Sequence, residues 1–369
     1  MKNTSILMMV SVAVLALANS CNKDDMPDTS KYTIYTTGQY YGVGGNLSCY
    51  WKNSERTDVP DLAPDYYFRR EMFVSNGDVY LAGARYISND PGGMNTTLGP
   101  SYWKNGVRTD LDMGDYTSGR TEYIKVANGK VYTAGHVFKN TGEWYENEIK
   151  YCYWINNERT DITDFPENYS DAYVAGIFVY SNDVYVCGGY RKGDEYHVCY
   201  WKNGVLRTDM SETSKYTRPL PSIFVDNGKV YIGGAINTGN MTPDYRQIFE
   251  ACYWVDGQFV KVDNNGQVAA IFVENGTVYT GGVDTSTSPY TACYWKGTSK
   301  TSVMHRAIIN GLHVKDGIVF TAGFRFELAG LENNYYPCYW VNTKRVDLPF
   351  PTKDNYYKWN NEAYSIFVE

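Results

Sequence analysis

Short apolar runs alternate with turn residues along nearly the whole chain, and three motifs recur in them. The first is an apolar run that ends in a turn, such as "IFVDNG" at 223–228, and the second is V-Y-x-x-G, such as "VYIGG" at 230–234. The third is C-Y-W, a turn and R-T-D, as in "CYWKNGVLRTD" at 199–209. Asn-Gly between two apolar runs favours a β-hairpin because both residues accept a positive φ. The pattern therefore predicts four short antiparallel strands in each repeat.

The repeat occurs seven times along the chain. The tryptophans of its third motif lie 41 to 53 residues apart, at Trp51, Trp103, Trp154, Trp201, Trp254, Trp295 and Trp340. Four strands in a unit of this length are typical of a β-propeller blade. We therefore expect an all-β fold over residues 33–369, a seven-bladed β-propeller of four-stranded antiparallel blades. The Tyr and Trp of the third motif are expected to fill the space between stacked blades.

The two ends of the chain carry complementary parts of one repeat. The first repeat starts directly at "IYTTG" (34–38), whereas the chain ends in "AYSIFVE" (363–369), an apolar run with no V-Y-x-x-G after it. Strand 365–369 is expected to pair beside strand 33–38 and to complete a blade built from both termini. Such closure removes the exposed sheet edges that promote aggregation.

The N-terminal residues have the features of a bacterial export signal. The segment "MKNTSILMMVSVAVLALANSC" (1–21) holds Lys2, an apolar run too short to span a bilayer, and small residues before Cys21. It resembles a lipobox, which implies a lipoprotein signal peptide over 1–20 and a lipid on Cys21. Because Ala18 and Asn19 depart from the commonest lipobox pattern, a plain signal peptide is the alternative.

Residues 21–32 are expected to form the lipid anchor and a flexible tether. The segment "NKDDMPD" (22–28) resembles the Lys-Asp-Asp export tag of surface lipoproteins of Bacteroidetes, and the repeat resembles their Y-W-K-N-G repeats. The Gly-Gly strand ends resemble kelch blades, but the adjacent Tyr and Trp differ from the kelch spacing, so no kelch site is carried over. The resemblance implies an outer-membrane lipoprotein, attached to the membrane by its lipid, that faces the cell surface. A periplasm-facing orientation is the alternative.

The connections between strands fall into two classes. With the strands of a blade named A to D in chain order, the A–B and C–D turns are short and repetitive, whereas the B–C and D–A loops are long and differ in every blade. In an up-and-down sheet the two kinds of turn share one face, here called the turn face, and the two kinds of loop share the opposite loop face. Because a single ligand site is built from residues that do not repeat, we expect the ligand on the loop face, over the central channel.

The segments expected to form this face are rich in aromatic residues, which offer flat amphipathic surface to sugar rings or protein partners. The candidate ligand-binding residues are Tyr66, Tyr67, Trp144, Tyr145, Tyr335, Tyr336, Tyr356, Tyr357 and Trp359. The alternative is that these rings pack beneath their own loops as small satellite cores.

The expected function is a non-catalytic, surface-anchored binding protein for a glycan or for an outer-membrane partner protein of a nutrient-uptake system. One alternative is a glycosidase or lyase that acts on polysaccharide through two acidic loop residues. The acidic candidates are Asp65, Asp115, Glu143, Glu146, Asp194, Glu195, Asp244, Glu250 and Asp354. A second alternative is a structural scaffold in a surface complex.

Charge and histidine content narrow the partners further. The net charge is −7 and no basic block is present, which argues against a nucleic-acid partner. The four histidines (136, 197, 305 and 313) fall in different repeats without the spacing of metal ligands, so neither a metal nor a cofactor is expected. The recurring Arg and Asp of R-T-D are expected on the outermost strand, where charge protects a sheet edge.

The cysteines recur with the repeat. Six of them occupy one position in six repeats, with Ser101 in the remaining one: Cys49, Cys152, Cys199, Cys252, Cys293 and Cys338. Packed sheets lie about 10 Å apart, which is too far for a disulfide between equivalent positions. These residues should therefore be buried thiols. A bridge between Cys187 and Cys199, across one hairpin, is the alternative for that pair.

Overall fold

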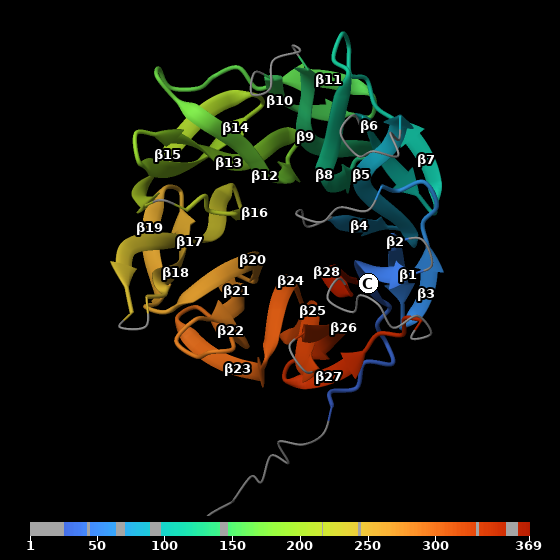
Figure 1. Ribbon diagram of the computed structural model, residues 1–369, viewed down its shortest axis with the longest axis vertical. Helices are drawn as coiled ribbons and strands as arrows, with labels where there is room; N and C mark the ends of the chain where they lie inside the picture. Colours follow the sequence, from blue (N-terminus) through green and yellow to red (C-terminus); the bar gives the residue numbers. More distant parts are fainter. Residues whose placement is uncertain are drawn as a thin grey trace, which may run out of the picture.

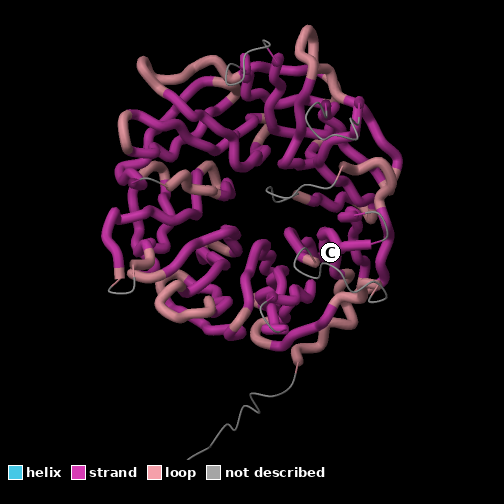
Figure 2. Tube along the Cα trace, viewed as in Figure 1, coloured by secondary structure: helices cyan, strands magenta, loops and turns pink. Residues whose placement is uncertain are grey.

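The computed structural model describes residues 26–42, 45–63, 71–88, 97–140, 147–215, 217–242, 245–329, 332–351 and 361–369. This part of the chain forms seven four-stranded antiparallel sheets arranged around a central axis, as Figure 1 shows. Figure 2 shows strands and loops but no helix in the described residues. The prediction of a seven-bladed β-propeller is thereby confirmed.

Each blade runs from its innermost strand A to its outermost strand D. The bounds are β28 (Glu362–Val368), β1 (Ile34–Gly42), β2 (Gly45–Lys52) and β3 (Glu55–Asp58) in blade 1; β4 (Met72–Ser75), β5 (Asp78–Ser88), β6 (Thr97–Lys104) and β7 (Val107–Asp110) in blade 2; β8 (Ser118–Ala127), β9 (Lys130–Asn140), β10 (Asn147–Ile155) and β11 (Glu158–Asp161) in blade 3; β12 (Ser170–Tyr180), β13 (Asp183–Lys192), β14 (Glu195–Lys202) and β15 (Val205–Lys215) in blade 4. Then follow β16 (Ser222–Asp226), β17 (Lys229–Met241), β18 (Gln247–Val255) and β19 (Gln258–Asp263) in blade 5; β20 (Gly266–Glu274), β21 (Thr277–Asp284), β22 (Thr291–Lys296) and β23 (Ser299–His305) in blade 6; and β24 (Ala307–Lys315), β25 (Ile318–Ala329), β26 (Glu332–Val341) and β27 (Lys344–Asp347) in blade 7.

The two ends of the chain close the ring in blade 1. Strand β28 lies beside β1, with Ile34 opposite Val368 and Thr36 opposite Ile366. Beyond the ladder, the N–H groups of Thr33 and Glu369 each donate to the other residue's carbonyl at 3.0 Å. The sequence prediction that the last strand pairs beside the first is confirmed.

The Asn-Gly turns have the expected backbone conformation and a second role. In the C–D turn of blade 2, Asn105 and Gly106 have φ values of 50° and 80°, the left-handed region that such a turn requires. The Asn105 side chain also accepts a hydrogen bond from the N–H of Val79, at the start of strand B, at 2.8 Å. Five other blades repeat this contact with Asn53, Asn156, Asn203, Asp256 and Asn342. The contact holds the C–D turn against the A–B turn, so both lie on the turn face.

The core lies between blades. All seven tryptophans of the third motif are at most 1% exposed. In three blades the indole N–H donates to a carbonyl of the preceding D–A segment, as Trp201 does to Asp164 at 2.7 Å. The expected interblade position of these rings is confirmed.

The cysteines are buried and free. All seven cysteines among the described residues lack a disulfide. Cys187 lies opposite Tyr200 and Gly188 lies opposite Cys199, so the two cysteines are one register step apart. The expectation of buried thiols is confirmed, and the Cys187–Cys199 bridge is not formed.

The outermost strands carry the expected ion pairs. Arg56 bonds Asp58 and Arg108 bonds Asp110, each at 2.9 Å. The Arg and Asp of each pair are two positions apart in strand D. Both charges therefore lie on the outermost strand, where charge discourages pairing with another sheet.

The N-terminal segment contacts the turn face of blade 7. The Tyr32 hydroxyl donates to Asp316 at 2.7 Å, and the Lys31 ammonium lies 3.1 Å from the same carboxylate. The Tyr32 ring packs edge-on against Phe320, with centroids 5.6 Å apart. Asp316 belongs to the A–B turn between β24 and β25, so the chain enters the propeller from the turn face. Within the described residues, no helix has the length and apolar character needed to cross a bilayer.

Candidate functional site

Two of the predicted ligand-binding residues lie in the described part of the chain, both in β26. The Tyr335 ring stacks on Phe324 with centroids 4.6 Å apart. The Arg325 guanidinium lies 4.1 Å from the centroid of the Tyr336 ring, and Phe350 contacts that ring edge-on. Both rings are half-buried against their own blade. The remaining candidates lie outside the described residues, as does Cys21: Tyr66, Tyr67, Trp144, Tyr145, Tyr356, Tyr357 and Trp359.

The long connection that contains Tyr335 is largely a strand extension. Strand β25 continues to Ala329 and β26 begins at Glu332, with ten residue pairs in register. The hairpin thus projects from the loop face as a regular ladder. The expectation of a long irregular loop at this place was wrong, because the alternating apolar residues of "FRFEL" (324–328) extend the strand.

Exposed apolar side chains gather on the loop face. Of the twelve large hydrophobic side chains that are exposed among the described residues, nine lie in B–C or D–A segments or at the strand ends beside them: Leu47, Tyr86, Ile87, Ile149, Tyr169, Leu220, Met241, Tyr245 and Tyr290. Tyr245 is the most exposed of them, at 86%. Val107 and Val205 follow the C–D turns, and Met26 lies in the N-terminal segment. The asymmetry marks the loop face as the apolar one.

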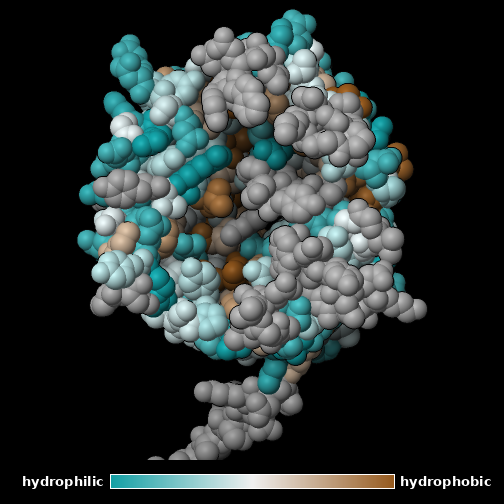
Figure 3. Space-filling view, viewed as in Figure 1, coloured by the Kyte–Doolittle hydropathy of each residue, from teal (hydrophilic) through white to brown (hydrophobic). Residues whose placement is uncertain are grey.

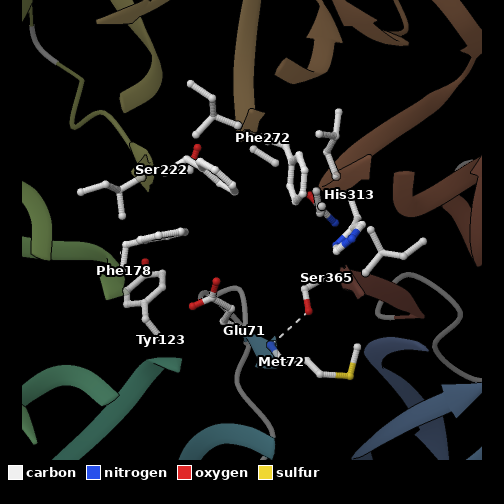
Figure 4. A pocket seen from close by; sticks show the side chains of 18 of the residues that line it. Glu71, Met72, Tyr123, Phe178, Ser222, Phe272, His313 and Ser365 are labelled. Atoms are coloured by element: carbon white, nitrogen blue, oxygen red, sulfur yellow. Dashed lines mark hydrogen bonds between the residues drawn. The ribbon is translucent and has the colours of Figure 1, made fainter. Parts of the chain in front are cut away.

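A cavity of about 430 Å³ occupies the central channel and is lined by strand A of all seven blades. Figure 3 shows hydrophobic surface inside the central hollow of an otherwise mostly hydrophilic rim. In Figure 4 the side chains of Phe178, Phe272 and His313 surround the cavity, with Ser365 beside His313 and Glu71 across from Phe272. A cavity of this size with a mainly apolar lining and a few polar groups has the usual properties of a small-molecule site.

A ring of seven equivalent side chains lines this cavity. Each pairs with the aromatic residue of the V-Y-x-x-G strand in its own blade: Phe73, Lys125, Phe178, Phe224, Phe272, His313 and Phe367. The aromatic members touch in sequence, with centroids 4.7 to 5.0 Å apart from Phe178 through Phe224, Phe272 and His313 to Phe367, and on to Phe73. We call this set the channel ring.

Lys125 and His313 stand where the other five blades have Phe. The Lys125 ammonium lies 5.6 Å from the centroid of Phe73 and pairs with the Glu71 carboxylate. The second Glu71 oxygen accepts the Ile124 N–H at 3.0 Å. Burial, with the positive charges of Lys315 and Lys125 nearby, lowers the pKa of His313 to about 3. The channel ring is therefore electrically neutral around pH 7, since its one cation is paired and its imidazole is uncharged.

Strand A carries a β-bulge near the channel in five blades. The register shifts three residues before the channel ring in β8, β12, β20, β24 and β28, and the residues at the shift are Glu122, Ala175, Ala269, Asn310 and Tyr364. Bulges re-aim the side chain that they carry. These positions differ from blade to blade, in contrast to the ring of Phe residues.

Glu122 belongs to a polar cluster on the loop-face side of the bulge. Its buried carboxylate lies 3.2 Å from Arg120 Nε and 3.8 Å from His136 Nδ1. Burial, with Arg120 and Arg218 nearby, lowers the pKa of His136 to about 3. Arg218 stacks on the ring of Tyr173, 4.0 Å from its centroid. The cluster brings together a buried carboxylate, two guanidinium groups and a neutral imidazole, and of these Arg218 reaches the end of the channel.

A smaller cavity of about 260 Å³ adjoins this end of the channel. Arg218, Gln267 and Tyr290 line it, and it shares Leu220 and Ala269 with the central cavity. The two cavities therefore meet beneath the loops of blades 5 and 6. No group of three or more His, Cys, Asp or Glu side chains within the described residues is arranged to hold a metal ion.

The sequence contained a signal for the channel ring that the motif analysis did not use. "IKVANG" (124–129) and "LHVKDG" (312–317) both replace the Phe of the I-F-V pattern, with Lys125 and His313. Glu122 lies in the same strand as Lys125, three residues earlier. A residue that breaks a repeat at a scaffold position is a functional candidate, since the scaffold needs the common residue there.

No family model matches this sequence, and a search of curated proteins found no match. Among solved structures, a mutant Trypanosoma rangeli sialidase with trans-sialidase activity aligns with a TM-score of 0.48 at 9% identity, over 90% of this chain and 56% of that chain. The polysaccharide lyase Uly1 aligns with a TM-score of 0.45 at 10% identity, over 90% of this chain and 87% of that one. A Bombyx mori GH32 β-fructofuranosidase has a TM-score of 0.37 at 12% identity, over 80% and 84% of the two chains. Likeness at this level carries no activity over to this chain.

Proposed function

We propose that this chain is a non-catalytic binding protein that is lipid-anchored at the cell surface and holds its ligand on the loop face. We favour a glycan as the ligand. The other ligand that we consider is a partner protein of a nutrient-uptake system. The observation that carries it is the gathering of exposed apolar and aromatic side chains in the B–C and D–A segments. Binding residues are disproportionately found on variable loops held by a rigid scaffold, and aromatic side chains exposed there offer amphipathic contact surface.

The chemistry of this face supports a sugar ligand. Tyr86, Tyr169, Tyr245 and Tyr290 each combine an exposed apolar ring with a hydroxyl group. Such rings cover the C–H face of a pyranose while the hydroxyl bonds to the sugar's own hydroxyl groups. The turn face lacks comparable exposed aromatic residues among the described residues, so the two ends of the propeller differ in what they can recognise.

A glycan array with the purified chain from residue 22 onward tests the proposal. Binding of a defined set of glycans, with the bound sugars recovered unchanged, supports it. Loss of the same binding in Tyr245→Ala, with retention in Val205→Ala on the turn face, places the ligand on the loop face. A protein that binds no glycan and captures no outer-membrane protein contradicts the proposal and favours a structural scaffold.

A polysaccharide-acting enzyme is the second candidate, and the polar cluster of Glu122, Arg120 and His136 favours it. A buried carboxylate and an imidazole whose pKa is strongly lowered lie side by side here, and strongly perturbed groups of this kind occur often at functional sites. Incubation with bound glycans distinguishes the two functions. New reducing ends or unsaturated sugars that disappear in Glu122→Gln identify an enzyme, whereas unchanged glycans identify a binding protein.

A further inference from the structure

The central cavity has a chemical character of its own, distinct from the exposed loop face. The channel ring contains five Phe side chains that are partly exposed to the cavity. Contact between these aromatic side chains and water is unfavourable, so a ligand that covers them gains binding free energy from the apolar surface that it buries. The ring therefore favours a ligand with a large apolar surface.

The two exceptions in the ring give the cavity its polarity. A fold that is satisfied by Phe in five blades does not need Lys125 or His313 in the other two, so these residues serve something other than the scaffold. Lys125 is neutralised by Glu71. His313 is uncharged, and no hydrogen bond links its ring nitrogens to the described residues. An uncharged imidazole offers one donor and one acceptor.

The residue two positions before the channel ring differs from blade to blade. Blades 4, 6 and 7 have Gly176, Ala270 and Gly311 there, whereas blades 2 and 3 have Glu71 and Tyr123. A Cβ at Gly176 or Gly311 would meet the neighbouring blade at about 3 Å, so these glycines let adjacent blades approach closely. Ala270 lines the cavity.

We propose that the channel ring binds a neutral aromatic molecule that carries one hydroxyl or N–H group. The aromatic surface would pack against Phe178, Phe224 and Phe272, where aromatic pairs add about 0.5–1.5 kcal/mol beyond area burial. The polar group would hydrogen-bond to the imidazole of His313. A charged ligand is disfavoured because Lys125, the charged member of the channel ring, is already neutralised by Glu71.

Isothermal titration calorimetry with 2-naphthol, naphthalene and 2-naphthoate tests this site directly. These three probes share one bicyclic ring and differ in having a neutral hydroxyl, no polar group or a negative charge. We expect one 2-naphthol to bind per chain, more tightly than naphthalene and at least tenfold more tightly than 2-naphthoate. Equal binding of all three probes, or no binding of 2-naphthol, overturns the proposal.

Three variants locate the probe. Ala270→Leu fills the cavity from a half-exposed position and should weaken 2-naphthol binding at least tenfold, whereas Val107→Leu on the outer turn should not change it. His313→Phe restores the common residue of the repeat and should weaken 2-naphthol by roughly threefold to tenfold, the value of one hydrogen bond, without weakening naphthalene. Unchanged 2-naphthol affinity in Ala270→Leu places the probe elsewhere and overturns the site.

The melting temperature of each variant separates lost binding from lost folding. If Ala270→Leu fails to fold, Ala269→Leu provides a second filling variant, because Ala269 also lines the cavity at the bulge. The proposal does not depend on glycan recognition, since glycan binding is measured on the loop-face variants and 2-naphthol binding on the channel variants. Either result can fail while the other stands.

Discussion

Thr36 of the first strand lies opposite Ile366 of the last strand, and this contact joins the ends of the chain into one blade. The ladder runs from Ile34 to Gln39 and is supported by both hydrogen bonds between Thr33 and Glu369. A ring closed in this way has no free inner edge in blade 1. The stability of the entire propeller therefore depends on a strand at the C-terminus.

Deletion of residues 363–369 should abolish cooperative folding or cause aggregation. The deletion exposes the inner edge of β1 and removes Ile366 and Val368, which are buried in the core between blades 1 and 7. Thermal unfolding and size-exclusion chromatography measure the effect. As a control, removal of residues 22–27, which lie before Asp28, the first residue of the described N-terminal segment with a hydrogen bond, should leave the melting temperature unchanged. An unchanged melting temperature after the C-terminal deletion would show that the closure contributes little.

Alanine at the loop-face aromatic residues should reduce ligand binding without affecting folding. We expect Tyr245→Ala and Tyr290→Ala, and the variants of Trp144, Tyr357 and Trp359, to weaken glycan binding by about 1–3 kcal/mol each if they are stacking platforms. Glycan affinity and the melting temperature are measured together. A variant that fails to fold identifies its ring as part of the core instead.

Thiol titration should find seven free thiols in the denatured, unreduced protein that begins at residue 22. In the folded protein the thiols should react slowly, because burial raises the pKa of Cys187, Cys293 and Cys338 and leaves little reactive thiolate. Five thiols in the denatured protein would indicate a Cys187–Cys199 bridge, and three or fewer would contradict the blade register.

Acidification should destabilise the fold partly through His313. Its pKa is lowered from the usual 6.5 to about 3 in the folded state, so the unfolded chain binds one more proton between these two pH values. Stability is therefore unaffected by this group above pH 6.5 and decreases as the pH falls below it, by about 2 kcal/mol at pH 5. His313→Phe should show a shallower fall of the free energy of unfolding between pH 6.5 and 4 than the original protein, as measured by urea unfolding. Equal slopes would mean that His313 is protonated as easily in the fold as in the unfolded chain.

Lys125→Phe alone should destabilise the protein although it restores the common residue of the repeat. It leaves the Glu71 carboxylate in an apolar channel without its cation, at a cost of about 2 kcal/mol given that both side chains keep partial solvent contact. The double variant Glu71→Gln with Lys125→Phe should recover most of this loss. A double-mutant cycle from urea unfolding measures the coupling, and additive effects would contradict it.

The blade count, the closure and the division into two faces could be derived from the sequence, because a scaffold that repeats seven times also repeats its requirements. The first residue of the C–D turn illustrates this, since its side chain makes the same contact with strand B in six blades, from asparagine in five of them and from Asp256 in the sixth. Tryptophan recurs for the same reason. The residues required by the turns and by the packing between blades therefore both recur with the period of the sequence repeat.

The channel could not be derived in the same way. Lys125 and His313 were visible as departures from I-F-V, but their convergence depends on strand A being innermost in every blade. The contact between Glu122 and His136 depends on a register shift between Thr121 and Tyr123, and no residue type in this segment predicts that shift. Tyr335 and Tyr336 were expected in an irregular loop and instead pack along an extended hairpin. Residues that occur in only one blade produce no periodic pattern, so their positions cannot be predicted from the repeat.

The contact of Tyr32 and Lys31 with Asp316 has a consequence for how the molecule is presented to its surroundings. In the lipid-anchored form that we propose, ten residues connect Cys21 to Tyr32, and Tyr32 is bound beside the A–B turn of blade 7. Ten residues reach at most about 35 Å when fully extended. In that form Tyr32 would lie within this distance of the bilayer, so the turn face would be the side nearest the membrane and the loop face would point away from it. A large polymer in the medium can then reach the loops of all seven blades without passing between the protein and the lipid.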